Sequence, residues 1–503
     1  MIWPLRRAVQ VAAKSPAVRF EDVRLTYLEM WERCRRLVGG LRALGLERGD
    51  RVAVVAQNSH RYLELYQAVP GAGFVLVPLN HRHTDAELRY ALEDSGARAL
   101  FAARALEGLP ACVEHVADAD QGYEDLLAAS APAAFPDDVG EDDLAGLFYT
   151  GGTTGASKGV MLRHRALVAN ALHFQAALPF EPETTFLLVA PMFHLAGTIA
   201  VLAIVWHGGR QVVMRAFDAA AAVDLVERER VTMTQVVPSM LAAMCDEQLE
   251  RPRDVSSLRY LTFGGAPSAT ETLRRARRAF PAAELATMYG ATETAPLVTA
   301  MRHLERLLGG PQARSCGRPL VGVQARIVDP QDRTPVAVGE VGEVAVRGPN
   351  VMAGYWNKAE QTAAVLVNGW YHTGDLGRLD EEGYLYLVDR AKDMIVTGGE
   401  NVYSTEVEDV LYRHPAVMEA AVFGIPDPRW GEAVHAVVVP RAGASVSEAE
   451  LVAHCRESIA GYKVPKRVEL RSEPLPKSGA GKVLKRELRA PHWQGRDAMV
   501  SGA

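Results

Sequence analysis

The sequence predicts an α/β protein that ends in a smaller α+β unit, and three observations lead to this fold class. In the first third of the chain, strand-like apolar segments (51–56, 73–78 and 99–103) alternate with segments of helical spacing, which is typical of mostly parallel sheets covered by helices. Near residue 393 this alternation gives way to a different order of helices and strands. With 503 residues, 48% of them apolar, the chain is long enough for roughly two to four domains or subdomains.

Local signals predict individual elements of the first part. Thr84, with Glu87 three residues later, forms a capping box that predicts the start of a helix. The apolar run 144–149 predicts a buried strand. The nearly uncharged segment 186–206 is long enough to span a bilayer, but a proline, a histidine and a glycine interrupt its first half. We therefore expect a buried strand, turn and helix there, and no transmembrane segment.

The last part of the chain predicts a compact domain. We expect a helix opening at Thr405/Glu408, strands at 420–425 and 433–439, and a second helix capped by Ser447. These elements make an α+β unit of ~110 residues, a normal size for an independent domain.

Composition narrows the class of partner and the compartment. The net charge of −6 and the absence of basic runs with interleaved aromatic residues argue against a nucleic-acid partner. The five cysteines are scattered and form no metal-ligand spacing, so neither a disulfide framework nor a structural zinc site is expected. No convincing signal peptide follows the N-terminal basic pair. These features favour a cytoplasmic protein; a homodimer is one assembly that the sequence leaves open.

A loop rich in glycine and hydroxyl side chains follows the strand at 144–149 and predicts a polyphosphate site. Its glycines allow backbone N–H groups to approach anionic oxygens, while the hydroxyls and one lysine add donors and charge. A Walker loop has a glycine directly before its lysine, whereas this chain has Ser157 there. An ordinary surface turn is the alternative. The candidate phosphate-binding residues are Thr150, Gly151, Gly152, Thr153, Thr154, Gly155 and Lys158.

Two downstream clusters carry groups suited to a nucleotide. In the segment 288–294, Tyr289 can stack on a base, Thr292 can bond a phosphate and Glu293 can hold a hard cation such as Mg²⁺. Asp375 follows a glycine and can accept hydrogen bonds from ribose hydroxyls. Each cluster taken alone is also ordinary turn chemistry.

Two further clusters lie near the predicted domain junction and the C-terminus. Charged residues at 389–393 and the glycine pair at 398–399 suit a junction that moves, with a solvated linker as the alternative. Lys482 stands on a glycine-rich loop that, considered alone, is typical of a flexible basic tail.

Together, in this order and spacing, the motifs resemble the acyl-activating, adenylate-forming enzymes: acyl-CoA synthetases, peptide-synthetase adenylation domains and firefly-type luciferases. The resemblance runs from about residue 20 to about residue 490. It implies a large N-terminal domain (1–389) with helix-covered, mostly parallel sheets and a β-rich subdomain, a hinge (390–392), and a small mobile C-terminal domain (393–503). The implied reaction joins a carboxylic acid to ATP, giving acyl-AMP and pyrophosphate, and then transfers the acyl group to a thiol.

The resemblance also assigns roles residue by residue. Lys158 and its loop hold the β- and γ-phosphates, Glu293 binds Mg²⁺, and Thr292 contacts the α-phosphate. Lys482 acts at the carboxylate and α-phosphate during adenylation, and Lys392 occupies the hinge position. At the adenine, the implied positions are Tyr289, which stacks on the base, and opposite it Gly264, Gly265 and Ala266; Gly290 is a further nucleotide-binding position. At the ribose they are Asp375 and Arg390. The positions implied for the coenzyme A tunnel are Gly398, Gly399 and Glu400.

Two residues depart from the family's usual loop. Gly151 stands where most relatives have serine, and Ser157 where they usually have proline. The first change removes a phosphate-facing hydroxyl and the second a rigid joint. We expect activity to survive with weaker ATP affinity, because the backbone N–H groups and Lys158 remain.

The acid pocket is expected to be apolar. Amino-acid-activating relatives carry an aspartate at the position of His194, so an amino acid is disfavoured. The other wall positions implied by the resemblance are Thr198, Val201, Val237 and Ala291, with Gly264 beside them. They are small or apolar, which fits a fatty or aromatic acid. Medium- or long-chain fatty acyl-CoA synthetases and aryl-CoA synthetases are the nearest match, with coenzyme A as the thiol.

Three alternatives remain at this point: a fatty acyl-AMP ligase that loads a carrier protein, a luciferase-like monooxygenase, and a non-catalytic nucleotide-binding relative. The retention of Glu293, Asp375, Arg390, Lys392 and Lys482 argues against the last.

Overall fold

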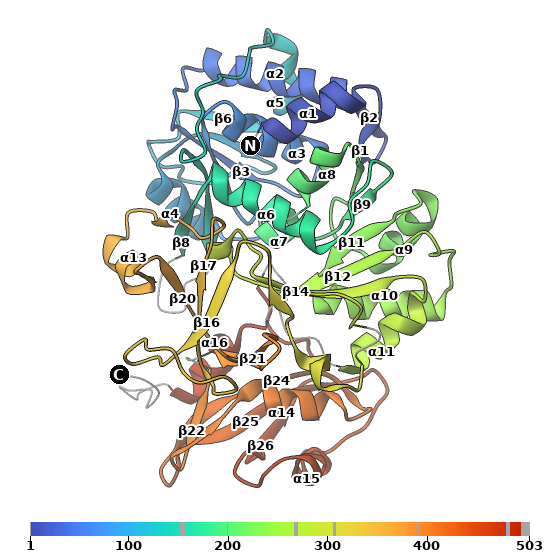
Figure 1. The fold of residues 1–503 in the computed structure, drawn as a ribbon, viewed down its shortest axis with the longest axis vertical. Coiled ribbons are helices and arrows are strands. Elements are labelled where there is room, and N and C mark those ends of the chain that lie inside the picture. The colour runs from blue at the N-terminus through green and yellow to red at the C-terminus, as the bar shows by residue number, and fades with distance from the viewer. Residues whose placement is uncertain are drawn as a thin grey trace.

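The computed structural model describes residues 2–150, 157–198, 200–265, 270–304, 308–390, 393–478 and 483–493. Their strands form four sheets. Figure 1 shows the N-terminal part of the chain, with its helix-covered sheets, above a smaller C-terminal part of strands and short helices. The architecture is the predicted α/β class with a large N-terminal and a small C-terminal domain.

The nine-stranded sheet has the order β15-β14-β13-β12-β11-β9-β10-β1-β2. The strands from β13 to β1 in this order are parallel to one another, which confirms the predicted parallel character, and the outer strands β14 and β2 pair antiparallel with β13 and β1. Helices α8 (Val201–His207), α9 (Ala219–Arg228), α10 (Pro238–Glu250) and α11 (Thr270–Ala279) connect or cover these strands. The strand bounds are β1 Pro16–Phe20, β2 Val23–Thr26, β9 Thr185–Leu188, β10 Arg210–Val213, β11 Met233–Val236, β12 Tyr260–Gly264, β13 Glu284–Tyr289, β14 Thr299–Met301 and β15 Arg318–Pro319.

The seven-stranded sheet has the order β18-β8-β7-β4-β3-β5-β6 and shares a hydrophobic core with the first sheet. Its strands are β3 Arg51–Val55, β4 Val75–Pro78, β5 Ala97–Ala102, β6 His115–Asp118, β7 Leu144–Thr150, β8 Lys158–Arg163 and β18 Gly354–Tyr355. The helices of this part are α1 Trp3–Ala12, α2 Tyr27–Ala43, α3 His60–Gly71, α4 Asp85–Ser95, α5 Gln121–Ala129 and α6 His164–Ala177. The three strands predicted in the first third are β3, β4 and β5.

The third sheet is the β-rich part that the resemblance implied. All its strand pairs are antiparallel. It contains β16 Gln324–Val328, β17 Gly342–Arg347, β19 Leu366–Val367, β20 Trp370–Leu379 and β21 Leu385–Arg390, with α13 Ala359–Val365 beside it. Its last strand, β21, therefore ends at Arg390.

The fourth sheet forms the C-terminal domain and has hydrophobic clusters of its own. Its strands are β22 Ile395–Thr397, β23 Glu400–Val402, β24 Val417–Asp427, β25 Gly431–Pro440 and β26 Arg467–Leu470; its helices are α14 Ser404–Tyr412, α15 Glu448–Ser458, α16 Lys485–Arg489 and the 3₁₀ helix η3 Ala490–Trp493. The predicted strands at 420–425 and 433–439 are the centres of β24 and β25. The β22–β23 hairpin and β26 were not predicted.

Local capping signals were right where the helix end is exposed. Thr84 caps α4 and Ser447 caps α15, each in the reciprocal box with the glutamate three residues later. Helix α14 begins at Ser404, and its N-cap residue provides no side-chain cap. The hydroxyl of Thr405 donates to the carbonyl of Val388, and Glu408 accepts from the N–H of Val422 and pairs with Lys485, so tertiary contacts occupy both side chains.

The segment 186–206 forms β9, the one-turn helix α7 (Leu195–Thr198) and α8, as the interrupted apolar run predicted. Across the described residues, every helix is too short or too polar to cross a membrane.

Candidate active site

The carboxyl ends of four neighbouring parallel strands bring predicted site residues to one edge of the nine-stranded sheet. His194 lies after β9, Val237 directly after β11, Gly264 at the end of β12 and Tyr289 at the end of β13. From β9 the chain passes to β10 on one side of β9 and then to β11 on the other side. Ligands of open α/β sheets bind at such a switch in strand order, outside the carboxyl ends.

Tyr289 and Asp375 are joined across two sheets. The phenol of Tyr289 donates a hydrogen bond of 2.8 Å to Oδ2 of Asp375, which lies on β20 of the antiparallel sheet. Asp375 pairs in register with Arg390 of β21, so the two residues predicted to contact the ribose lie on neighbouring strands. Burial and the neighbouring carboxylate raise the pKa of Tyr289, so the phenol stays protonated and keeps donating. The side chains assigned to adenine and ribose are therefore held by one another.

A tyrosine that was not predicted connects the metal candidate to the phosphate lysine. The phenol of Tyr355 donates to Oε1 of Glu293 at 2.8 Å, and Nζ of Lys158 lies 4.9 Å from the centre of the Tyr355 ring. Tyr355 is placed by β18, which pairs with β8, the strand that begins at Lys158. Tyr355 lies 62 residues after Glu293 and almost 200 residues after Lys158 in the sequence, and the chain around it carries no local motif that would have marked it.

Close backbone contacts fix the turn that carries Glu293. A Cβ atom on Gly290 would lie 1.7 Å from the carbonyl oxygen of Pro296, so only glycine fits there. The buried amide of Asn350 donates to the carbonyls of Thr294 at 2.9 Å and Leu297 at 2.6 Å. The 3₁₀ helix η1 (Thr292–Thr294) therefore has a defined position. Asn350 is a second site residue that sequence analysis missed.

Glu293 also has the chemistry of a magnesium ligand. Its half-buried carboxylate lies next to the hydroxyl-bearing Thr292, and carboxylate and other oxygen ligands are those that Mg²⁺ prefers. The residues present therefore fit the predicted ion.

Two of the predicted acid-pocket residues line a small buried cavity. Thr198 and Val201 contribute to a cavity of about 20 Å³, room for little more than one water molecule. Asn170 of α6 also lines it, and its Oδ1 is buried without a hydrogen-bond partner in the part of the chain that the structure describes. His194, Val237 and Ala291 are not part of this lining. The other lining residues are Tyr66, Leu167, Leu195, Leu202 and Ala295.

The predicted coenzyme A positions form the tight turn between β22 and β23. Gly398 and Gly399 have φ angles of +59° and +86°, and Glu400 begins β23. The N–H of Gly398 donates to the carbonyl of Trp430 at 2.8 Å, and a Cβ there would lie 2.8 Å from the indole ring. Glycine therefore lets this turn approach Trp430.

Several predicted residues lie outside the described part of the chain. Gly265, with a φ of +84°, ends the described segment after β12. For Arg390 only the backbone pairing is described. The residues outside the description are Gly151, Gly152, Thr153, Thr154, Gly155, Ala266, Lys392 and Lys482.

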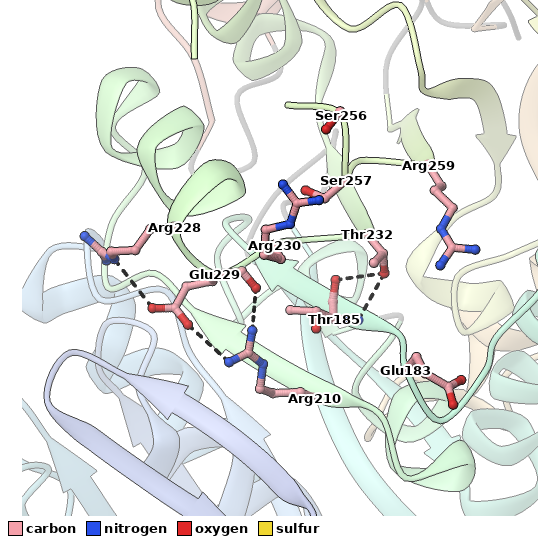
Figure 2. A pocket seen from close by; sticks show the side chains of 10 residues that line it. All are labelled: Glu183, Thr185, Arg210, Arg228, Glu229, Arg230, Thr232, Ser256, Ser257 and Arg259. Carbon is pink, nitrogen blue, oxygen red and sulfur yellow. Dashed lines mark hydrogen bonds and ion pairs between the residues drawn. The ribbon is translucent and has the colours of Figure 1, made fainter. Parts of the chain in front are cut away.

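The opposite edge of the nine-stranded sheet carries a larger depression, shown in Figure 2. Its volume is about 660 Å³, and it lies at the amino ends of the strands, where Thr185, Arg210 and Arg259 stand. No predicted site residue lines it among those described. Glu229 pairs with both Arg210 and Arg228, so the arginines that gather there are in part neutralised.

Comparison with known proteins identifies the class that this fold and site define. Residues 5–356 match the family of AMP-binding enzymes, and residues 406–482 match the AMP-binding enzyme C-terminal domain. The chain is 42% identical over 497 residues to a feruloyl-CoA synthase of Amycolatopsis sp., covering 97% of this chain and 98% of that protein.

Solved structures agree with this assignment. ATP-bound MatB from Rhodopseudomonas palustris superposes with a TM-score of 0.89 at 31% identity, covering 98% of this chain and 99% of that one. The o-succinylbenzoate CoA synthetase MenE from Bacillus subtilis, in complex with its acyl-adenylate intermediate, gives 0.86 at 30% identity, with 99% of both chains covered. MenE is also known in complex with ATP and a magnesium ion.

The chain belongs to the AMP-binding enzymes, the adenylate-forming superfamily. Within it, the protein is an acid–thiol ligase, an AMP-forming acyl-CoA synthetase.

Proposed function

We propose that this ligase activates a compact aromatic acid that carries a hydroxyl group, of the hydroxycinnamic type, and transfers it to coenzyme A. In the first half-reaction the acid's carboxylate attacks the α-phosphorus of ATP, the bond to the β-phosphate oxygen breaks, and pyrophosphate leaves. In the second, the thiol of coenzyme A attacks the acyl carbon, AMP leaves, and the thiol proton passes to solvent. The observation that carries the choice of acid is the small cavity with the unpaired Oδ1 of Asn170.

The cavity favours a ring over a long chain. At about 20 Å³ it accommodates an acid only if its lining side chains move, and a thin planar ring demands less movement than a long flexible chain. A buried acceptor without a partner costs about 1–3 kcal/mol, and a hydroxyl on the substrate would remove that cost. The feruloyl-CoA synthase relative, at 42% identity, supports the same class of acid. A medium-chain fatty acid is the second candidate, supported by the apolar Leu167, Val201 and Leu202.

The nucleotide roles follow from the contacts of the described side chains. Tyr289 offers its ring to adenine while its phenol orients Asp375, whose remaining acceptor capacity suits the ribose hydroxyls. Lys158, against the face of Tyr355, supplies positive charge to the phosphates. A magnesium ion held by Glu293 would neutralise further phosphate charge. Cancelling this charge matters because both the attacking carboxylate and ATP are anionic.

The proposal includes the assignments that the sequence suggested for the remaining residues. Arg390 would hold the ribose with Asp375, and Lys482 would stabilise the charge that develops between carboxylate and α-phosphate. The C-terminal domain would then turn about the hinge at 390–392, which contains Lys392, so that the turn at Gly398 and Gly399 lines the path of the coenzyme A thiol. The first half-reaction needs Lys482, whereas the second does not.

An acid panel tests the proposed substrate class. We expect 4-hydroxycinnamate and its 3-methoxy derivative to give coenzyme A-dependent AMP release with the highest kcat/KM, followed by cinnamate and then octanoate. Detection of the acyl-CoA product separates this outcome from loading of a carrier protein. Octanoate as the best substrate would contradict the proposed aromatic acid while leaving the ligase chemistry intact.

Asn170→Leu tests whether the unpaired Oδ1 of Asn170 recognises the substrate hydroxyl, because leucine has a similar volume and no hydrogen-bond acceptor. We expect kcat/KM for 4-hydroxycinnamate to fall by about tenfold, the loss of roughly one hydrogen bond, with the value for cinnamate unchanged. Cinnamate thus serves as an internal control for folding and nucleotide binding. An equal fall for both acids would show that Asn170 does not recognise the hydroxyl.

A further inference from the structure

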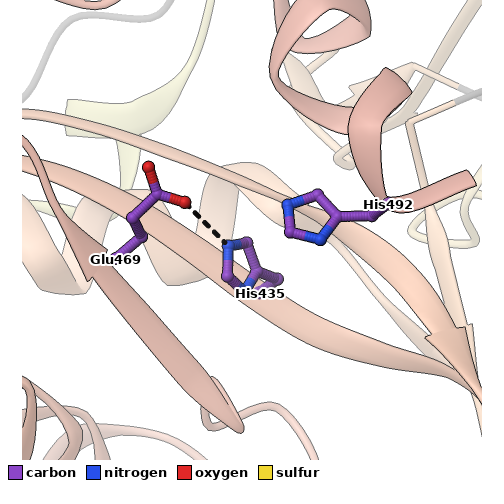
Figure 3. A group of neighbouring side chains, drawn as sticks. All are labelled: His435, Glu469 and His492. Carbon is purple, nitrogen blue, oxygen red and sulfur yellow. Dashed lines mark ion pairs between the residues drawn. The ribbon is translucent and has the colours of Figure 1, made fainter.

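Two histidines and a glutamate from distant segments meet on one face of the C-terminal sheet. His435 lies on β25, Glu469 on the parallel strand β26, and His492 on η3 (Figure 3). One ligand-capable atom of each residue lies within 4.8 Å of those of the other two. The adenylation chemistry proposed above uses none of these residues.

His435 is the unusual member of this group. Its side chain is only 5% exposed, and neither ring nitrogen has a hydrogen-bond partner among the described residues. The carboxylate of Glu469 lies nearby, with its Oε2 4.0 Å from Nε2 of His435, too far for a hydrogen bond. A buried imidazole with both nitrogens unpaired is costly, so the arrangement indicates a ligand that the polypeptide itself does not supply.

The burial of His435 suits metal binding. Burial disfavours the charged imidazolium, and the neutral imidazole, which has a lone pair to donate, is the form that binds metal ions.

The surrounding contacts hold the two rings near each other. The indole N–H of Trp493 donates to the carbonyl of Gly424 at 3.1 Å, which fixes η3 on β24. The ring of Phe423 lies 5.3 Å from that of His435 and 6.0 Å from that of His492, centre to centre. The imidazoles themselves are 4.8 Å apart and tilted by 53°. His435 is buried, and His492, which is not buried, lies against its ring.

We propose that His435, Glu469 and His492 bind one zinc ion, with water as the fourth ligand. Two imidazoles and one carboxylate are a ligand set that zinc takes in proteins, and hard ions such as Mg²⁺ prefer oxygen ligands alone. Tetrahedral zinc, with bonds of about 2.0–2.1 Å, separates its ligand atoms by roughly 3.3 Å. The ligand atoms of the three residues lie at most 4.8 Å apart, so bringing them to this separation requires small side-chain rotations, mainly at the more exposed Glu469 and at His492.

The ion would tie the end of the chain to the C-terminal sheet. His492 stands ten residues after Lys482 (positions 482 and 492), with helix α16 between them. Lys485 at the start of that helix is already anchored by Glu408 at 2.7 Å. Zinc would add a second anchor beyond the helix and so stabilise the segment that follows Lys482.

A zinc titration of the full-length chain tests the site. The metal-free protein, without nucleotide, competes with a chromogenic chelator for Zn²⁺ alone. We expect one equivalent to bind and the midpoint of thermal unfolding to rise. His435→Gln, Glu469→Gln and His492→Gln should each weaken zinc binding by at least about tenfold, the scale on which ligand-shell changes act. Cobalt(II) bound to the wild type should show the visible absorption of a tetrahedral site.

The C-terminal domain also provides a matched control. His454 and His414 form a second pair of rings 5.2 Å apart, but Nε2 of His454 lies 3.0 Å from the carbonyl oxygen of Val410 and Nδ1 of His414 accepts from the N–H of Ala416. His454→Gln should leave zinc binding unchanged.

Two results would overturn the zinc site: absence of saturable binding, or binding that is the same in all three ligand variants as in the wild type. An equal loss in His454→Gln would also overturn it. If His435→Gln fails to fold, the zinc affinity of Glu469→Gln decides, because the side chain of Glu469 is exposed. The readout does not involve acid activation, so it is independent of the proposed substrate.

Discussion

The two edges of the nine-stranded sheet are built from the same strands and differ in what they can bind. At the carboxyl edge, strand ends run into turns where Gly264 and Gly290 allow backbone segments to touch and where Tyr289 reaches Asp375. At the amino edge, the larger depression collects arginines, and Glu229 and Asp254 neutralise several of them. Cavity size and charge alone would therefore point away from the edge that carries the predicted nucleotide-binding residues.

The difference follows from how a parallel sheet is connected. Outside the carboxyl ends, the chain leaves β9 and β11 in opposite directions, and open α/β sheets bind their ligands at such a switch in strand order. Backbone groups and turn residues are then available to a ligand. At the amino edge Arg210, Arg228 and Arg230 already pair with carboxylates, so a ligand gains little by displacing those pairs.

The largest expected effect lies at the carboxyl edge and comes from the C-terminal domain. Lys482→Ala should lower acid-dependent pyrophosphate exchange by on the order of a thousandfold, because it removes a charge that acts on the transition state. Transfer from supplied acyl-AMP to coenzyme A should stay within a few-fold of wild type. Lys477→Ala is the control, because Lys477 precedes Lys482 by five residues in the sequence and its side chain pairs with Glu419. Equal loss of both half-reactions would contradict the proposed rotation.

A smaller effect is expected at the contact between the nine-stranded sheet and the antiparallel β-rich sheet. Asp375→Ala should raise the KM for ATP by roughly 10- to 100-fold, the value of a hydrogen bond to a charged group. Asp332→Ala, in an exposed turn of the same β-rich part, should leave it unchanged. The measurement is the initial rate of AMP release over a range of ATP concentrations. An unchanged KM for ATP in Asp375→Ala would refute the assignment of Asp375 to the ribose.

The smallest effect is expected at the amino edge. Arg230, which pairs with Asp254 at 3.0 Å, has an exposed side chain, so Arg230→Ala should change stability by no more than about 0.5 kcal/mol. kcat and KM for all three substrates should equal those of the wild type. A clear fall in activity would mean that the arginine-rich depression takes part in function, and the contrast between the edges would fail.

Sequence reasoning worked best where the signal is local. The capping boxes at Thr84 and Ser447 and the apolar runs of β3, β4 and β5 fix elements by contacts within a few residues. It was less informative at Thr405 and Glu408, whose side chains contact Val388 and Lys485 and not the helix end.

The site itself could be predicted only in part. The motif residues Tyr289, Glu293 and Asp375 were predicted as nucleotide-binding residues because aromatic, carboxylate and glycine-turn chemistry is visible in short segments. Asn170 and Tyr355 were missed because their importance comes only from their partners.

By itself, the sequence determined the α/β class, the adenylate-forming motifs and the small C-terminal unit, since periodicity and turn chemistry act over a few neighbouring residues. Only the tertiary structure decided which distant groups meet: the Tyr289–Asp375 bond, the Tyr355 link between Glu293 and Lys158, and the grouping of His435 with Glu469 and His492. The physical reason is that strand order and register bring such groups together, and these are set by packing of the whole chain.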